Sequence, residues 1–240
     1  MRFVTVDLKR AFTERAFWLC VLAGCVLAAV SLAAALQADG GSAASDLFRA
    51  AQSLLLVFTA PILAAIPYSG MLMSEEETGY GLMMKEKLGE GGYEFRRFLV
   101  TGLTGGMSLM LPELFLWGGC LAAGMYTHGG AGPDAAGIPG VMLLNFASGF
   151  CFAGVSYGLG FLNRKRYLPV VMPQVFYLLF TYAFPYLGLT SCYPPLLVSP
   201  WAAGAIERNQ AHILLAAMLL FGLACTGAGK AMRLWREHRK

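Results

Sequence analysis

The sequence contains little charge for its length. Only 13% of its 240 residues are Asp, Glu, Lys or Arg, about half of the roughly 25% found in soluble domains, whereas 57% are hydrophobic. This composition excludes a soluble fold, whose surface needs more charge, and intrinsic disorder, which requires low hydrophobicity. The six cysteines include no Cys-x-x-Cys pair and are too sparse for a disulfide-based secreted scaffold. The composition therefore predicts a membrane protein with several spans.

The phosphate loop of nucleotide-binding proteins is also missing. The sequence has no Gly-x-x-x-x-Gly-Lys-Ser/Thr motif, and His-Glu-x-x-His does not occur. The pattern Gly-x-Ser-x-Gly occurs once, at residues 154–158, inside the predicted span 141–162. His128 and His212 are predicted near the external ends of spans and His238 in the tail, whereas the acidic run at Glu75–Glu77 is predicted at the inner face. The basic clusters are short and lie beside spans, which indicates contacts with membrane lipids rather than nucleic acid. We therefore expect no catalytic residues, metal site or cofactor in this chain.

Runs without charge predict six transmembrane helices, because a hydrocarbon core about 30 Å thick needs about 20 helical residues. The predicted spans cover about residues 16–38, 50–73, 98–127, 141–162, 168–188 and 209–229. The uncharged run from Tyr167 to Ile206 is long enough for two crossings, but Lys and Arg accumulate in cytoplasmic loops. Six spans place 16 of the 18 basic residues on one side, whereas seven would give 12 against 6. We expect one transmembrane domain, residues 1–240, in a bacterial inner membrane with both termini cytoplasmic.

Two segments outside the spans are expected to touch the membrane. Residues 1–15 place apolar residues on one helical face and predict an interfacial helix. A signal peptide is the competing interpretation of the N-terminus, but the following uncharged run of 23 residues is longer than usual for one. Residues 189–208 are apolar and contain three prolines, which predicts an external re-entrant segment. The alternative is an apolar loop that lies on the headgroups.

The loop at residues 74–97, expected to be cytoplasmic, predicts a short separate helix. Ser74 and Glu77 form a Ser-x-x-Glu capping box, which places the acids Glu75–Glu77 at the positive end of the helix dipole. The helix is expected to end near Leu88, before Gly89. Such a helix carries both charged and exposed apolar residues, a surface that suits a cytoplasmic partner. A plain interfacial helix is the alternative.

The order of these features resembles the permease subunit of ABC type-2 transporters. The resemblance also rests on the segments Glu76–Tyr80, Ala64–Ser69 and Tyr93–Arg97, and is to small six-span bacterial members similar to bacteriocin-immunity and drug-efflux permeases. It implies that the loop carries a coupling helix, which docks on a separate cytoplasmic ATPase that binds ATP and Mg. The implied coupling residues are Glu75, Glu76, Glu77, Gly79, Tyr80 and Met83. Residues Glu90–Gly92 are expected to break the chain, and Gly89–Gly92 lie where many relatives have a Pro-x-Ser/Thr-Arg element.

The resemblance implies an exporter in which two permease copies, identical or homologous, enclose a pathway. The spans contain few charges, which favours an apolar or amphipathic cargo such as a peptide, drug or lipid. A different class of function stays open, namely a membrane scaffold or sensor that recruits cytoplasmic partners and moves no cargo. A neighbouring gene for a phosphate-loop ATPase would distinguish the two.

Glu113, which follows Pro112, is the one acid that we place deep in the membrane. An ionised residue at that depth is costly and by default faces a bundle interior or wet cavity. We expect Glu113 to line the pathway or the dimer seam; the alternative is a structural acid paired to a tyrosine or a freed carbonyl. Two small-residue patterns, Gly102-x-x-x-Gly106 and Gly154-x-x-x-Gly158, predict close helix packing within the chain first and a subunit interface second.

Overall fold

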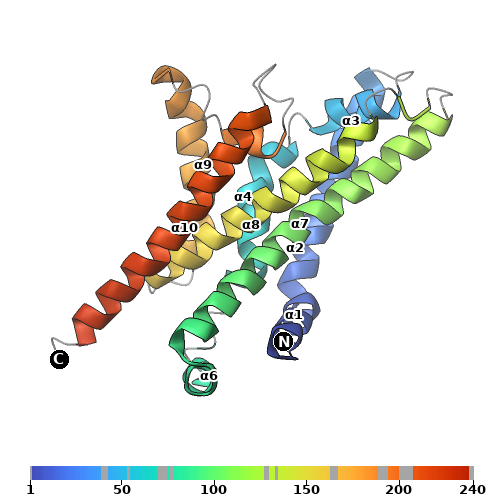
Figure 1. Cartoon of the computed structure of the whole chain (residues 1–240). Coiled ribbons are helices and arrows are strands. Elements are labelled where there is room, and N and C mark those ends of the chain that lie inside the picture. Colours follow the sequence, from blue (N-terminus) through green and yellow to red (C-terminus); the bar gives the residue numbers. More distant parts are fainter. Residues whose placement is uncertain are drawn as a thin grey trace.

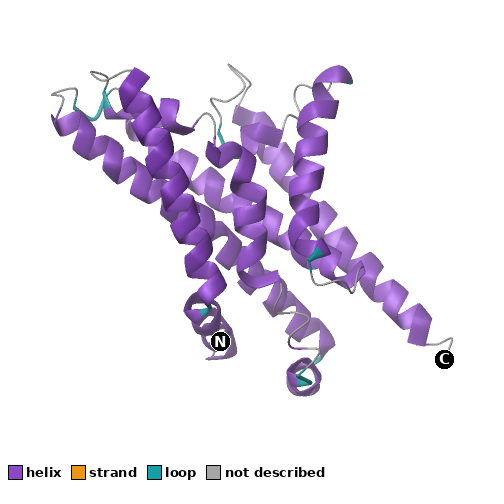
Figure 2. Ribbon diagram, turned by 180° about the vertical axis from the view of Figure 1, so that it is seen from behind, coloured by secondary structure: helices purple, strands orange, loops and turns teal. Residues whose placement is uncertain are grey.

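The computed structural model describes residues 2–38, 43–52, 55–69, 75, 78–126, 130–132, 135–162, 167–188, 194–199 and 208–237. Within these ranges the regular elements are helices and no strand occurs. Figures 1 and 2 show long helices that lean across one another from one end of the molecule to the other. The predicted all-α class is confirmed.

Five helices are long and apolar enough to cross a membrane. They are α2 (Arg15–Ala38), α7 (Glu90–Tyr126), α8 (Ile138–Leu162), α9 (Leu168–Tyr186) and α10 (Arg208–Glu237). Each coincides with a predicted span, although α7 begins eight residues early and α10 continues eight residues further. These apolar runs are helical because a helix pairs its backbone N–H and C=O groups within the segment, and a membrane offers no water to bond them.

The second predicted span, 50–73, is not a straight helix. It is replaced by α3 (Ala44–Gln52) and α4 (Leu55–Ser69), whose axes differ by 75°. The helix α3 is amphipathic: it carries Asp46 and Arg49 and buries Phe48 against the ends of α2 and α7. Its apolar face therefore turns the chain sideways before α4 continues between α2, α7, α8 and α9. Counted as one broken span, the pair brings the number of candidate spans to six.

One end of the bundle gathers the elements that carry most basic residues. Figure 1 places α1 (Arg2–Thr13), α6 (Tyr80–Leu88), the start of α7 and the end of α10 at this end, with α3 at the opposite end. The helix predicted over residues 1–15 is thus present as α1. Figure 1 also shows α6 end-on while α7 runs across the picture, so α6 crosses the base of α7.

The loop helix differs from its prediction at one end. It begins at Tyr80, after Gly79 in the left-handed conformation (φ 71°), and ends before Gly89 (φ 73°) as predicted. Its first turn therefore contains no acid. Of the predicted capping segment, Ser74, Glu76 and Glu77 lie outside the described residues.

The predicted chain break at Glu90–Gly92 is wrong, because α7 begins at Glu90 and continues through the glycines. Glycine costs about 1 kcal/mol per residue in a helix interior relative to alanine. The buried side chains of Tyr93, Arg96 and Arg97 in this extension have tertiary partners, which offset that cost.

Helix α8 lies at the centre and packs closely on α7 and α10 through glycines. A Cβ atom at Gly149 would lie 2.5 Å from the backbone oxygen of Gly105, and one at Gly158 would lie 2.6 Å from that of Gly222. The predicted glycine seams also face neighbours within the chain: Gly102 contacts the ring of Phe150. The intrachain interpretation of these seams is confirmed.

A short 3-10 turn, η3 (Pro194–Leu197), is the described part of the predicted re-entrant segment 189–208. It packs against α8, α9 and α10, and Leu197 and Val198 are buried. The Ser148 hydroxyl donates to the backbone oxygen of Leu197. This irregular backbone is therefore covered by protein.

Candidate functional site

A buried carboxylate holds the α6 end of the molecule together. Glu75 is 1% exposed, and Nη1 of Arg10 donates to its Oε1 at 3.0 Å. The hydroxyl of Tyr93 donates to Oε2 at 2.8 Å, and Arg97 forms a second ion pair with the same oxygen. One carboxylate thus links α1 to α7 immediately before the chain enters α6.

Cation–π contacts add α6 to this arrangement. The guanidinium of Arg10 lies 5.3 Å from the centre of the Tyr80 ring, and Nζ of Lys85 lies 6.0 Å from that of Tyr93. A Cβ atom at Gly81 would lie 3.4 Å from the Tyr93 hydroxyl, so this face of α6 is in van der Waals contact range of α7. The base of α6 is therefore fixed by contacts from both neighbouring helices.

A second buried ion pair joins α1 to α7. Nε of Arg96 donates to Oδ2 of Asp7 at 2.9 Å, and its Nη2 reaches the same oxygen. Both side chains are buried. We call seven of these residues the end network: Asp7, Arg10, Glu75, Tyr80, Tyr93, Arg96 and Arg97. The network therefore connects α1, α6, α7 and Glu75.

The outer face of α6 is apolar and charged at once. Leu82 is 72% exposed and Met83 48%, and the exposed residues Glu86 and Lys87 flank them. On α7, Phe95 is also exposed. Met84, one residue on, is buried against the bundle. The face has the mixture of large apolar anchors and charges found at protein interfaces.

The structure describes four of the six predicted coupling residues. Glu75 lies inside the end network, where it positions α6 and has no outer surface for a partner, whereas Met83 lies on the outer face. Gly79 supplies the left-handed residue before α6, and Tyr80 stacks on Arg10. The remaining two, Glu76 and Glu77, lie outside the described residues.

Sequence reasoning did not single out Arg10 and Asp7 as partners of the loop. Their partners are 65 and 89 residues away in sequence, so no local pattern reveals the pairs. The available signal was the presence of an acid in a basic interfacial helix and of paired arginines beside a span.

Glu113 forms a second buried polar cluster, near the middle of α7. It is 1% exposed, and Nε2 of Gln52 donates to its Oε1 at 2.8 Å. Nδ2 of Asn145 donates to the same oxygen. The structural partners are thus amides from α3 and α8, not the tyrosine or carbonyl considered above. Within the described part of the chain, no basic side chain pairs with Glu113.

A cavity of about 270 Å³ lies between α7, α8 and α10 at the end where α6 lies. Its lining residues are Gly91, Glu94, Phe95, Phe98, Tyr157, Leu223, Thr226 and Gly227. Phe98 and Tyr157 meet edge to face with ring centres 6.1 Å apart. The lining is mostly apolar, with three aromatic rings and one acid, and the pocket is open on one side.

Across the described ranges, no three His, Cys, Asp or Glu side chains converge in a way that could hold a metal ion. No protein-family model, curated protein or solved structure matches this chain.

Proposed function

We propose that the chain is the permease subunit of an ATP-driven exporter similar to ABC type-2 transporters. A separate cytoplasmic ATPase would bind ATP and Mg and supply the energy, since the sequence lacks a phosphate loop. The proposal rests mainly on the position of α6. This short helix crosses the base of α7, exposes Leu82 and Met83, and is anchored by the end network.

The end network supports a coupling role for α6. A partner that moved α6 would pull on Glu75, and through Arg97 on α7. Helix α7 has 37 residues and is therefore about 55 Å long, enough to carry a tilt from one end of the bundle to the other. Arg10 would draw α1 along with it. An isolated interfacial helix would need no such buried ionic connection.

The distribution of basic residues supports a cytoplasmic position for α6. The elements α1, α6, the start of α7 and the end of α10 share one end of the bundle, and they carry most of the lysines and arginines. Under the positive-inside rule this end faces the cytoplasm of a bacterial inner membrane. Both termini and the proposed docking face then lie where an ATPase is found.

The surfaces of the outer helices support a second permease copy, identical or homologous. The helices α9 and α10 are only 22% and 17% buried over their apolar windows, and they expose Val175, Leu179 and Leu220. Lipid covers such faces in a monomer, and a second copy covers part of them in a dimer. The aromatic cavity between α7, α8 and α10 supports an apolar or amphipathic cargo, such as a peptide, drug or lipid.

The proposal is tested by purifying the tagged chain from native membranes with its partners. We expect a phosphate-loop ATPase to copurify, and the variant Leu82→Asp/Met83→Asp to lose it while the permease remains folded. Trp235→Ser is the matched control, because it removes an exposed apolar residue from α10 and should leave the ATPase bound. Recovery of other cytoplasmic proteins but no ATPase, together with no effect of ATP in liposomes, would support the scaffold alternative instead.

A further inference from the structure

We propose that Gln52, Glu113 and Asn145 form an intramembrane binding site for one sodium ion. The inference concerns the isolated chain and does not depend on the proposed exporter function. In the described part of the chain, three buried oxygen atoms accept no hydrogen bond: Oε1 of Gln52, Oε2 of Glu113 and Oδ1 of Asn145. Native proteins rarely bury such atoms without a partner.

These oxygens lie close together. Both amide nitrogens donate to Oε1 of Glu113. In each amide group the oxygen is bonded to the same carbon as that nitrogen, so both amide oxygens also lie beside the carboxylate. The amide groups of Gln52 and Asn145 have nearly the same shape after a half-turn about the terminal bond. That half-turn would replace the two donors by two acceptors and surround the space beside the carboxylate with oxygen. An entering cation thus needs only side-chain rotation to acquire ligands from three helices.

The charge of the site selects a monovalent ion. Glu113 is the one ionisable member of the cluster, and the described basic residues form no ion pair with it. An uncompensated carboxylate is strongly disfavoured in a buried membrane position. One sodium ion would balance its charge, whereas calcium and magnesium favour sites with more carboxylates or retained water. Carboxylate and amide oxygens are ligands that hard cations prefer.

The backbone around Gln52 supports the same assignment. Gln52 is the last residue of α3, at the 75° break between α3 and α4. The C-terminal end of a helix is the negative end of its dipole. Broken helices in transporters use such ends to coordinate sodium or protons near the middle of the bilayer. Gln52 therefore contributes both a side-chain oxygen and a helix end.

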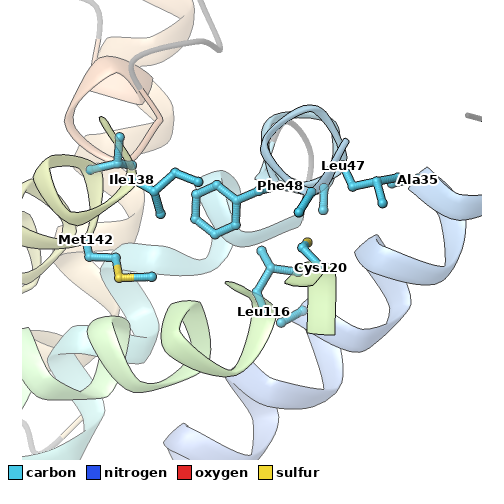
Figure 3. Close-up of a cluster of buried hydrophobic side chains, with 11 residues drawn as sticks. Ala35, Leu47, Phe48, Leu116, Cys120, Ile138 and Met142 are labelled. Carbon is cyan, nitrogen blue, oxygen red and sulfur yellow. The ribbon is translucent and has the colours of Figure 1, made fainter. Parts of the chain in front are cut away.

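An apolar layer closes the site on one side. Phe48, Leu116 and Met142 each lie one helical turn from a member of the cluster, and Figure 3 shows them packed together beside α3. A bound ion would be shielded from water on that side. Its exchange would require α3 to move away from α7 and α8. Sodium would therefore stabilise the packed position of α3.

The test is thermal unfolding of the purified chain in detergent, with NaCl compared to N-methyl-D-glucamine chloride at equal ionic strength. We expect the midpoint of the wild type to rise with sodium concentration and to saturate. The variant Glu113→Gln should need at least tenfold more sodium for the same rise. Glu86→Gln, which removes an exposed acid on α6, is the matched control and should respond as the wild type does. Equal midpoints in the two salts for the wild type would overturn the proposal.

If Glu113→Gln does not fold, direct binding of ²²Na⁺ to the folded wild type tests the sodium site. We expect about one ion per chain, displaced by unlabelled NaCl and not by N-methyl-D-glucamine chloride. Asn145→Asp should shift the preference toward calcium, because it doubles the negative charge of the cluster. No specific ²²Na⁺ binding, or a midpoint that depends on pH and not on sodium, would identify a proton or a purely structural cluster and refute the sodium site.

Discussion

The substitution Glu75→Gln removes the charge at the centre of the end network and nearly preserves its shape. In the wild type this carboxylate faces two guanidinium groups in different surroundings. The side chain of Arg97 is 2% exposed, whereas that of Arg10 is 42% exposed. The variant therefore leaves Arg97 buried without its counter-charge, while Arg10 turns to solvent.

The magnitude follows from these two exposures. Removing one partner of a buried ion pair costs about 3–5 kcal/mol, because the remaining charge is desolvated and uncompensated. An exposed pair contributes about 0–1 kcal/mol. We expect Glu75→Gln to lower the free energy of unfolding by about 3 kcal/mol and Arg10→Ala by less than about 1 kcal/mol. For soluble chains of this size, 3 kcal/mol corresponds to about 6–12 °C in the unfolding midpoint.

Thermal unfolding in detergent, followed by near-ultraviolet circular dichroism, measures these differences. The double variant Glu75→Gln/Arg97→Gln should be less destabilised than the sum of the single variants, with a coupling of about 1–3 kcal/mol. If Glu75→Gln unfolds at the wild-type temperature, or if the effects of the two single variants simply add, the buried network does not hold α6 to α7.

Three further substitutions test other parts of the fold. Gly149→Leu should abolish folding or lower the midpoint by about 10 °C or more, because its Cβ atom would lie 2.5 Å from the oxygen of Gly105. Gly118→Ala, whose Cβ atom would meet nothing within 4 Å, should leave the midpoint unchanged or raise it, by up to about 1 kcal/mol of helix propensity. Gly79→Ala should cost about 1–2 kcal/mol, because its φ of 71° is unfavourable for a residue with a Cβ atom; equal midpoints would show that α6 begins differently. Asp7→Asn should loosen α1 and speed its proteolysis, and an unchanged cleavage rate would contradict a role for the Arg96 pair.

The spans were predictable because they depend on length and apolar composition, which the sequence carries locally. The break between α3 and α4 was not, because the uncharged run that follows Arg49 continues across it and the turn depends on the packing of Phe48 against α2 and α7. The extension of α7 through Gly91 and Gly92 likewise depends on partners in α1. Propensity alone favours a break there, and tertiary contacts override it.

The candidate sites were predictable as isolated residues and not as constellations. Glu113 was recognisable because an acid deep in a span is costly, but its partners lie on α3 and α8. Glu75 was recognisable as part of an acidic run, which suggested an exposed helix start. The structure buries it instead, because Arg97 and Tyr93, 22 and 18 residues later, return to it on α7.

A photo-crosslinker placed on the outer face of α6 tests the proposed coupling most directly. A benzoyl-phenylalanine at position 83 should, in native membranes, crosslink to a protein with a phosphate loop. The same probe at position 175, on the exposed apolar face of α9, should not reach that protein. Crosslinks from position 83 to lipid alone, or to proteins without a phosphate loop, would contradict the account of α6 as the docking helix of an ATP-driven permease.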